Sequence, residues 1–175
     1  QPEAQLAAPS ASDTVASDKK ITVESELYRA VIDNKGAVIS SWQLDQYTVR
    51  KKDKSVEKFE MVAASQGEDY WRRPGSLIFK DPALTALANK EFYQITSDSF
   101  EKMKAPATIT MKLKRGDLEI DKRYEFDQNN YLVNLSAAAK KDGKPVECQF
   151  FLGQDIGPET EHEDSTVPLE AVSYQ

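Results

Sequence analysis

The sequence predicts an all-β protein, an antiparallel β-sandwich with at most one or two short helices. The first observation behind this is that apolar and polar side chains alternate along most of the chain, which is the period of a β-strand. The second is that only residues 81–90 carry a helix start signal. Such alternation is typical of antiparallel sheets that have one face in water.

Ten or eleven strands are expected, and turn residues separate them. In chain order the expected strands are 20–26, 27–33, 37–44, 59–64, 76–80, 91–98, 107–116, 117–127, 131–139, 145–152 and 169–174. Because the strands differ in length and several connections are long, a sandwich is favoured over a closed barrel.

Short connections predict the hairpins. Asn34-Lys35-Gly36 joins the second and third strands, and Gly36 can take the left-handed conformation that a three-residue hairpin with a bulge requires. Arg115-Gly116-Asp117 is likewise short enough for a hairpin. In 81–90, Asp81 is expected to cap the helix, with Pro82 at its first position.

Alternation also predicts which side chains are inside. In the strand after residue 106 the inward residues are Ile109, Met111 and Leu113. One face of the following strand carries Leu118, Ile120, Tyr124 and Phe126. In 145–152 one face is expected to hold Val146, Cys148, Phe150 and Leu152.

The length of 175 residues fits one domain with a sizeable core. Residues 1–19 lack aromatic residues and are rich in Ala, Ser and Pro, so we expect a flexible linker there and a domain at 20–175. No apolar run is long enough to span a bilayer, and the first residues lack the basic leader and apolar centre of a signal peptide.

The formal net charge of −6 argues against binding to a nucleic-acid backbone as the main function. Acidic residues concentrate between Asp155 and Glu170, where no Lys or Arg occurs. The opposite case is Arg50-Lys51-Lys52-Asp53-Lys54, with four bases and one acid. We interpret both runs as solvated loops.

Few residues here could carry out catalysis. The single histidine, His162, lies between two glutamates, and no second His or partner Cys stands nearby to complete a zinc site. Cys148 is the only cysteine, which excludes an intrachain disulfide, and its strand position predicts a small buried apolar residue. The sequence therefore predicts no catalytic residue, no metal and no cofactor, and it favours binding or structural work over an enzyme.

One loop offers a possible partner or ligand surface. Tyr70, Trp71, Arg72 and Arg73 precede a Pro-Gly turn and could stack on a sugar or a peptide. The interpretation favoured here is an aromatic plug over a sheet edge.

Residues 21–47 resemble the start of the large periplasmic domain of bacterial YidC membrane protein insertases (the YidC/Oxa/Alb family). In that family a strand ending in Leu-Tyr leads into a Gly-containing hairpin and a Ser-Trp/Phe pair. The matching positions are Val23, Leu27, Tyr28, Ala30, Asn34, Gly36, Ala37, Ser41, Trp42, Leu44 and Tyr47. The later strand order is similar up to about residue 158.

This resemblance implies a β-supersandwich, akin to galactose-mutarotase-like and carbohydrate-binding proteins. It also implies a place on the periplasmic side of the bacterial inner membrane, in a multi-pass insertase and chaperone that helps membrane proteins insert, fold and assemble. Residues 1–19 would then follow a transmembrane helix. Implied partners are the SecDF subunits of the Sec translocon and nascent inner-membrane proteins.

The family's domain is usually longer, so this chain is expected to be either a fragment or a reduced member. Three functions remain open: a non-catalytic docking or substrate-contact domain, a carbohydrate-binding or aldose-epimerase-like domain, and a structural spacer. The His and carboxylate pair of the mutarotase-like relatives has no counterpart near His162.

Overall fold

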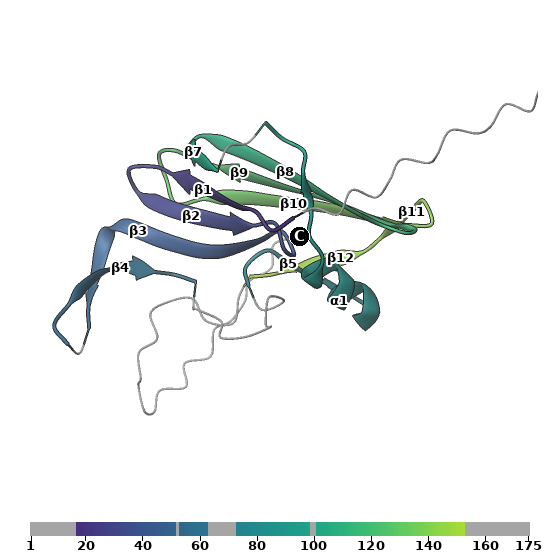
Figure 1. The fold of residues 1–175 in the computed structure, drawn as a ribbon, viewed down its shortest axis with the longest axis horizontal. Helices are drawn as coiled ribbons and strands as arrows, with labels where there is room; N and C mark the ends of the chain where they lie inside the picture. The colour runs from purple at the N-terminus through teal and green to yellow at the C-terminus, as the bar shows by residue number, and fades with distance from the viewer. Residues whose placement is uncertain (1–16, 52, 63–72, 99–100, 153–175) are drawn as a thin grey trace, which may run out of the picture.

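A computed structural model describes residues 17–51, 53–62, 73–98 and 101–152. Within them it confirms the predicted all-β sandwich, with two five-stranded sheets, a two-stranded sheet and one short helix (Figure 1). Among these residues no helix has the length and apolar character needed to cross a membrane.

The first sheet has the strand order β4-β3-β2-β1-β7. Its strands are β1 (Lys20–Glu24), β2 (Tyr28–Asp33), β3 (Val38–Arg50), β4 (Val56–Glu60) and β7 (Lys102–Lys104). Strands β1 to β4 pair antiparallel, whereas β1 and β7 pair parallel, so the expectation of a purely antiparallel fold fails at this edge.

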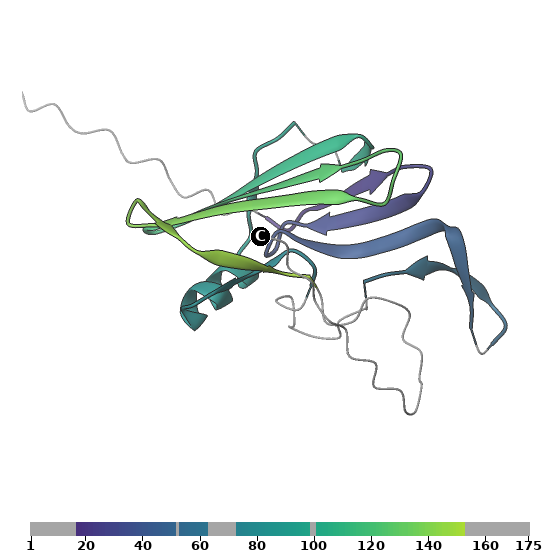
Figure 2. The same cartoon turned by 180° about the vertical axis from the view of Figure 1, so that it is seen from behind.

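The second sheet has the order β11-β10-β9-β8-β6, and the small sheet pairs β12 with β5. The strands are β5 (Ser76–Phe79), β6 (Gln94–Ile95), β8 (Ala107–Arg115), β9 (Leu118–Phe126), β10 (Val133–Lys141), β11 (Lys144–Val146) and β12 (Cys148–Phe151). Figure 2 shows from behind how the chain leaves the large sheet after β11 and continues as β12 beside β5.

One hydrophobic core joins the two large sheets. The predicted inward residues of β8 and β9 are 3% exposed or less. Facing them are Ile21, Val23, Tyr28, Ala30 and Ile32 from β1 and β2, all within the same cluster. Burial of this alternating set, at about 25 cal/mol per Å² of apolar surface, is the main force that holds the sheets together.

The helix α1 (Pro82–Lys90) begins as predicted. Asp81 is its N-cap, and its carboxylate accepts a hydrogen bond from the Ala83 N–H at 2.8 Å. The helix lies against β5, outside the two large sheets (Figure 1).

Several predicted boundaries were wrong for physical reasons. Of the expected strand 91–98, only Gln94–Ile95 pairs with β8. The residues before it bind the β2–β3 turn instead. There the Gly36 N–H donates to Glu91 O, and the Tyr93 N–H donates to Asn34 O. The expected strand 145–152 splits at Glu147 into β11 and β12. Leu152, expected on a buried face, is 66% exposed. The expected strand 169–174 lies outside the described residues.

The β2–β3 turn is held by a buried amide. Asn34 is 1% exposed, and its side-chain amide donates to the carbonyls of Tyr93 and Ser17 while its oxygen accepts from the Lys19 N–H. Gly36 has φ +68, and a Cβ there would lie 2.7 Å from Asn89 O. The turn therefore needs glycine for its conformation and for the close approach of α1.

Candidate functional site

The residues predicted for a ligand surface are only partly placed. Tyr70, Trp71 and Arg72 lie outside the described residues, as does His162. Arg73 is half-buried just before β5, and its carbonyl accepts a hydrogen bond from the Ser76 N–H at 3.1 Å. The loop remains a prediction.

No metal centre is seen in the part of the chain that the structure describes: no three His, Cys, Asp or Glu side chains gather closely enough to hold an ion there. The buried polar residues of greatest interest in this part lie where the three sheets meet, around Lys122, and beside β5.

Lys122 is the most unusual side chain of the described residues. It lies on the inner face of β9 and is 2% exposed. Its ammonium donates to three main-chain carbonyls, those of Gly36 at 2.7 Å, Ala37 at 3.2 Å and Gly75 at 2.8 Å. An ammonium has three N–H donors, so these three acceptors satisfy it fully.

The electrostatics of Lys122 balance two opposing effects. Burial lowers the pKa of Lys122 to about 7, because a charge is costly to remove from water. The three carbonyl dipoles favour the ammonium, as does the ring of Tyr93, whose centroid lies 5.2 Å from Nζ. Within the described residues the ammonium binds these carbonyls and pairs with no carboxylate.

Two tyrosines complete this cluster. The Tyr124 hydroxyl donates to Ala37 O, and the Tyr93 hydroxyl donates to Ala88 O at 3.0 Å. Burial raises the pKa of both tyrosines above its usual value. A Cβ at Gly75 would lie 2.5 Å from the Tyr124 hydroxyl, so the loop before β5 can reach Lys122 only because it has no side chain there.

Cys148 lies on β12 near this cluster. It is half-buried rather than buried as predicted. Burial raises the pKa of its thiol, and the charge of Lys122 opposes this without reversing it. A thiol with a raised pKa is a poor nucleophile at neutral pH.

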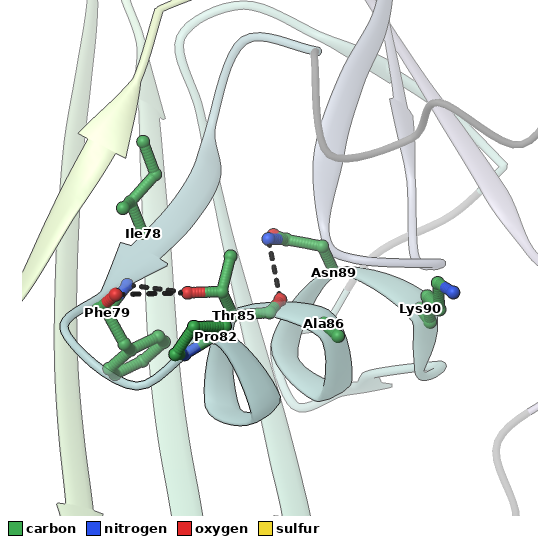
Figure 3. A pocket seen from close by; sticks show the side chains of 7 residues that line it. All are labelled: Ile78, Phe79, Pro82, Thr85, Ala86, Asn89 and Lys90. Carbon is green, nitrogen blue, oxygen red and sulfur yellow. Dashed lines mark hydrogen bonds between the residues drawn. The ribbon is translucent and has the colours of Figure 1, made fainter.

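The surface beside β5 carries an apolar pocket of about 440 Å³ (Figure 3). Its lining comes from β5 and α1: Ile78, Phe79, Pro82, Thr85, Ala86, Asn89 and Lys90. Ile78 is 41% exposed, which makes it a large apolar side chain open to a partner.

The polar side chains in this lining are used inside the protein. Thr85 Oγ1 accepts from the Phe79 N–H at 2.9 Å and donates to the Phe79 carbonyl (Figure 3). Asn89 accepts from the Leu77 N–H at 2.9 Å and donates to Leu77 O at 2.7 Å. These two side chains cover the outer edge of β5 as a neighbouring strand would.

Sequence reasoning missed Lys122 although the signal was present. Position 122 falls in the alternation of Leu118, Ile120, Tyr124 and Phe126, and a lysine in that register is a buried lysine. No comparable signal exists for Asn89, whose burial depends on where α1 packs.

The geometry defines an all-β sandwich domain in which the buried side chains of Asn34, Asn89 and Lys122 bind main-chain groups, with an apolar pocket on the surface beside β5. The family model of the YidC periplasmic domain matches residues 20–174. The chain belongs to the YidC periplasmic domain family. No match to a curated protein sequence was found.

Family membership makes this an insertase-associated domain on the periplasmic side of a membrane. The predicted family and fold class are therefore confirmed.

Proposed function

We propose that this domain is a non-catalytic docking surface of a membrane protein insertase, one that contacts nascent inner-membrane proteins and SecDF subunits during insertion and assembly. The observation that carries the proposal is the internal use of the reactive groups. Lys122, Tyr93 and Tyr124, whose pKa values are shifted, bind main-chain carbonyls and do not open into the pocket lining.

The pocket beside β5 supports a contact role. Its lining is apolar except for Lys90 at the end of α1, since Thr85 and Asn89 bind within the protein. An apolar side chain of a nascent membrane segment matches such a pocket in chemistry, and a volume of about 440 Å³ accommodates several side chains.

Site-specific photo-crosslinking in the full parent insertase tests this proposal. A photoreactive residue at Ile78 is expected to crosslink to nascent membrane proteins, and one at Arg73, beside the predicted aromatic loop, to nascent chains or SecDF. The matched control is Lys144, an exposed position on β11. Equal labelling at all three positions, or none, would leave only the spacer role.

The carbohydrate-binding or aldose-epimerase-like function remains the alternative. It predicts measurable sugar affinity that depends on Tyr70, Trp71 and Arg72. A calorimetric titration against a panel of sugars decides it, since a flat titration excludes that alternative and leaves the docking proposal in place.

A further inference from the structure

The hairpin formed by β3 and β4 extends beyond the sandwich. Figures 1 and 2 show it leaving the two sheets at the end where the β9–β10 connection lies. The pairing of β3 with β4 shifts between Leu44 and Thr48, and such a bulge turns the outer part of a hairpin away from its sheet. No apolar side chain of the described residues in 45–60 belongs to the core cluster or to the partly buried apolar side chains packed against it. Near the sheet, the Glu60 carboxylate accepts a hydrogen bond from the Trp42 N–H at 2.6 Å.

The outer part of this hairpin is basic in a chain whose formal net charge is −6. Its described bases are Arg50, Lys51, Lys54 and Lys58, and its described acids are Asp53 and Glu57. Lys51 pairs with Glu57 at 2.7 Å, and Lys58 pairs with Asp45.

Two of these bases are available to contact a binding partner. Arg50 and Lys54 are exposed and form no ion pair in the described part of the chain. Lys54 has φ +69, at a tip closed by hydrogen bonds between Lys51 and Ser55 and between Lys54 and Lys51.

Exposed apolar side chains lie on the same hairpin and beside it. Val56 pairs across the hairpin with Arg50 and is 59% exposed. Tyr47 is 54% exposed and meets the ring of Tyr131 edge-on, with centroids 6.4 Å apart. Next to Tyr131, Leu132 is 66% exposed. This end therefore combines cations with tyrosine and aliphatic side chains.

We propose that the β3–β4 hairpin is a contact site for the surface of a bilayer containing anionic phospholipids. Lysine and arginine are attracted to such a surface, and tyrosine sits favourably at the level of the headgroups. The proposal rests on the membrane location implied by the proposed function. A projecting tip that combines cations with apolar side chains matches a bilayer surface, where anionic headgroups lie above an apolar layer.

The acidic remainder of the chain does not prevent this contact. At physiological ionic strength the Debye length is about 8 Å, so charges on the distant body are screened from the hairpin tip. Binding at the tip would fix how the domain is oriented above the bilayer.

The β10–β11 hairpin provides a control that is also basic. Its tip carries Lys140, Lys141 and Lys144 with Asp142, and it lies at the other end of the molecule (Figure 1). No large exposed apolar side chain of the described residues lies in it. The two hairpins thus separate basic charge alone from basic charge beside apolar side chains.

Flotation of the purified 175-residue chain with vesicles tests the proposal. Binding is expected to vesicles of phosphatidylglycerol and phosphatidylethanolamine and to fall with added salt, with none to phosphatidylcholine vesicles. Each removed base is expected to weaken binding about 5-fold, so Arg50→Gln with Lys54→Gln should weaken it about 25-fold. Val56→Ser should weaken it further.

Lys140→Gln with Lys144→Gln should leave vesicle binding unchanged. Equal losses in both double variants, or no binding of the parent chain to anionic vesicles, would overturn the proposal, as would binding to an acidic poly-glutamate peptide without binding to vesicles. Vesicle binding needs no insertase or client, so its failure is separate from a failure of the docking proposal. Circular dichroism of each variant confirms that it is folded.

Discussion

The Lys122 ammonium donates to the Gly36 carbonyl over 2.7 Å, although the two residues lie 86 positions apart in the chain. This bond connects β9 of one sheet to the β2–β3 turn of the other. With the bond to Gly75 it also ties the loop before β5 to both. A single side chain thus links three segments that lie far apart in the sequence.

Replacing this lysine should destabilise the fold. Lys122→Met keeps most of the apolar volume but leaves the Gly36 and Gly75 carbonyls without a donor, at about 1–3 kcal/mol for each buried group. We expect the free energy of unfolding to fall by about 2–4 kcal/mol in urea denaturation. Lys140→Met on the exposed face of β10 is the control and should change it by less than about 0.5 kcal/mol. Equal effects of the two substitutions would contradict the role given to Lys122.

Stability should also depend on pH in a defined direction. The pKa of Lys122 is about 7 in the folded protein and about 10.4 in an unfolded chain. Between these values the unfolded state binds the extra proton, so the free energy of unfolding should rise as the pH increases above 7.

This rise is best measured between about pH 6 and 8.5. Above that range two other groups lower the free energy of unfolding as the pH increases. Burial raises the pKa of Cys148 and raises that of Tyr28 to about 12, so both groups lose their proton first in the unfolded chain. The expected gain is up to about 2 kcal/mol, and it should be absent in Lys122→Met. A flat profile for the parent protein would mean that the three carbonyls fully offset burial.

Gly36 and Gly116 form a matched pair of tests. Both have positive φ, +68 and +58, but a Cβ added at Gly36 would lie 2.7 Å from Asn89 O, whereas one added at Gly116 would meet nothing within 4 Å. Gly116→Ala should cost about 1 kcal/mol from backbone strain, whereas Gly36→Ala should cost about 2–4 kcal/mol. Thermal unfolding of both variants checks this, and equal costs would show that α1 can move away from the turn.

The substitution Asn89→Leu tests whether the Asn89 side chain pairs the outer edge of β5. This change leaves the Leu77 N–H and carbonyl unpaired, so we expect a loss of about 2–4 kcal/mol and faster hydrogen exchange at Leu77. Asn134→Leu on the exposed side of β10 is the control. Unchanged exchange at Leu77 would mean that another group covers this edge.

Much of the fold followed from local pattern. The strict alternation in β8 and β9 predicted both strands and their inward faces, and Asp81 with Pro82 predicted the start of α1. These signals sufficed because each depends on neighbours in the chain.

What was missed depends on contacts between distant segments. The parallel strand β7 is only three residues long, with the sequence Lys-Met-Lys. This is too short to show an alternating pattern, so its pairing with β1 could not be predicted from the sequence. The switch of β12 to β5 interrupts the run 145–152, which the sequence presents as one strand with Val146, Cys148, Phe150 and Leu152 on one face. Asn89 and the pocket beside it arise only when α1 packs against β5.

The most direct test of the docking account is an insertion assay in cells that depend on the full parent insertase. Replacing the exposed pocket residue with a charge, Ile78→Asp, should impair membrane protein insertion or partner copurification while the protein stays folded and abundant. Ile78→Val should behave as the parent does. If Ile78→Asp has no effect and crosslinks from this face are absent, the claim that the domain works by contact through this surface is wrong.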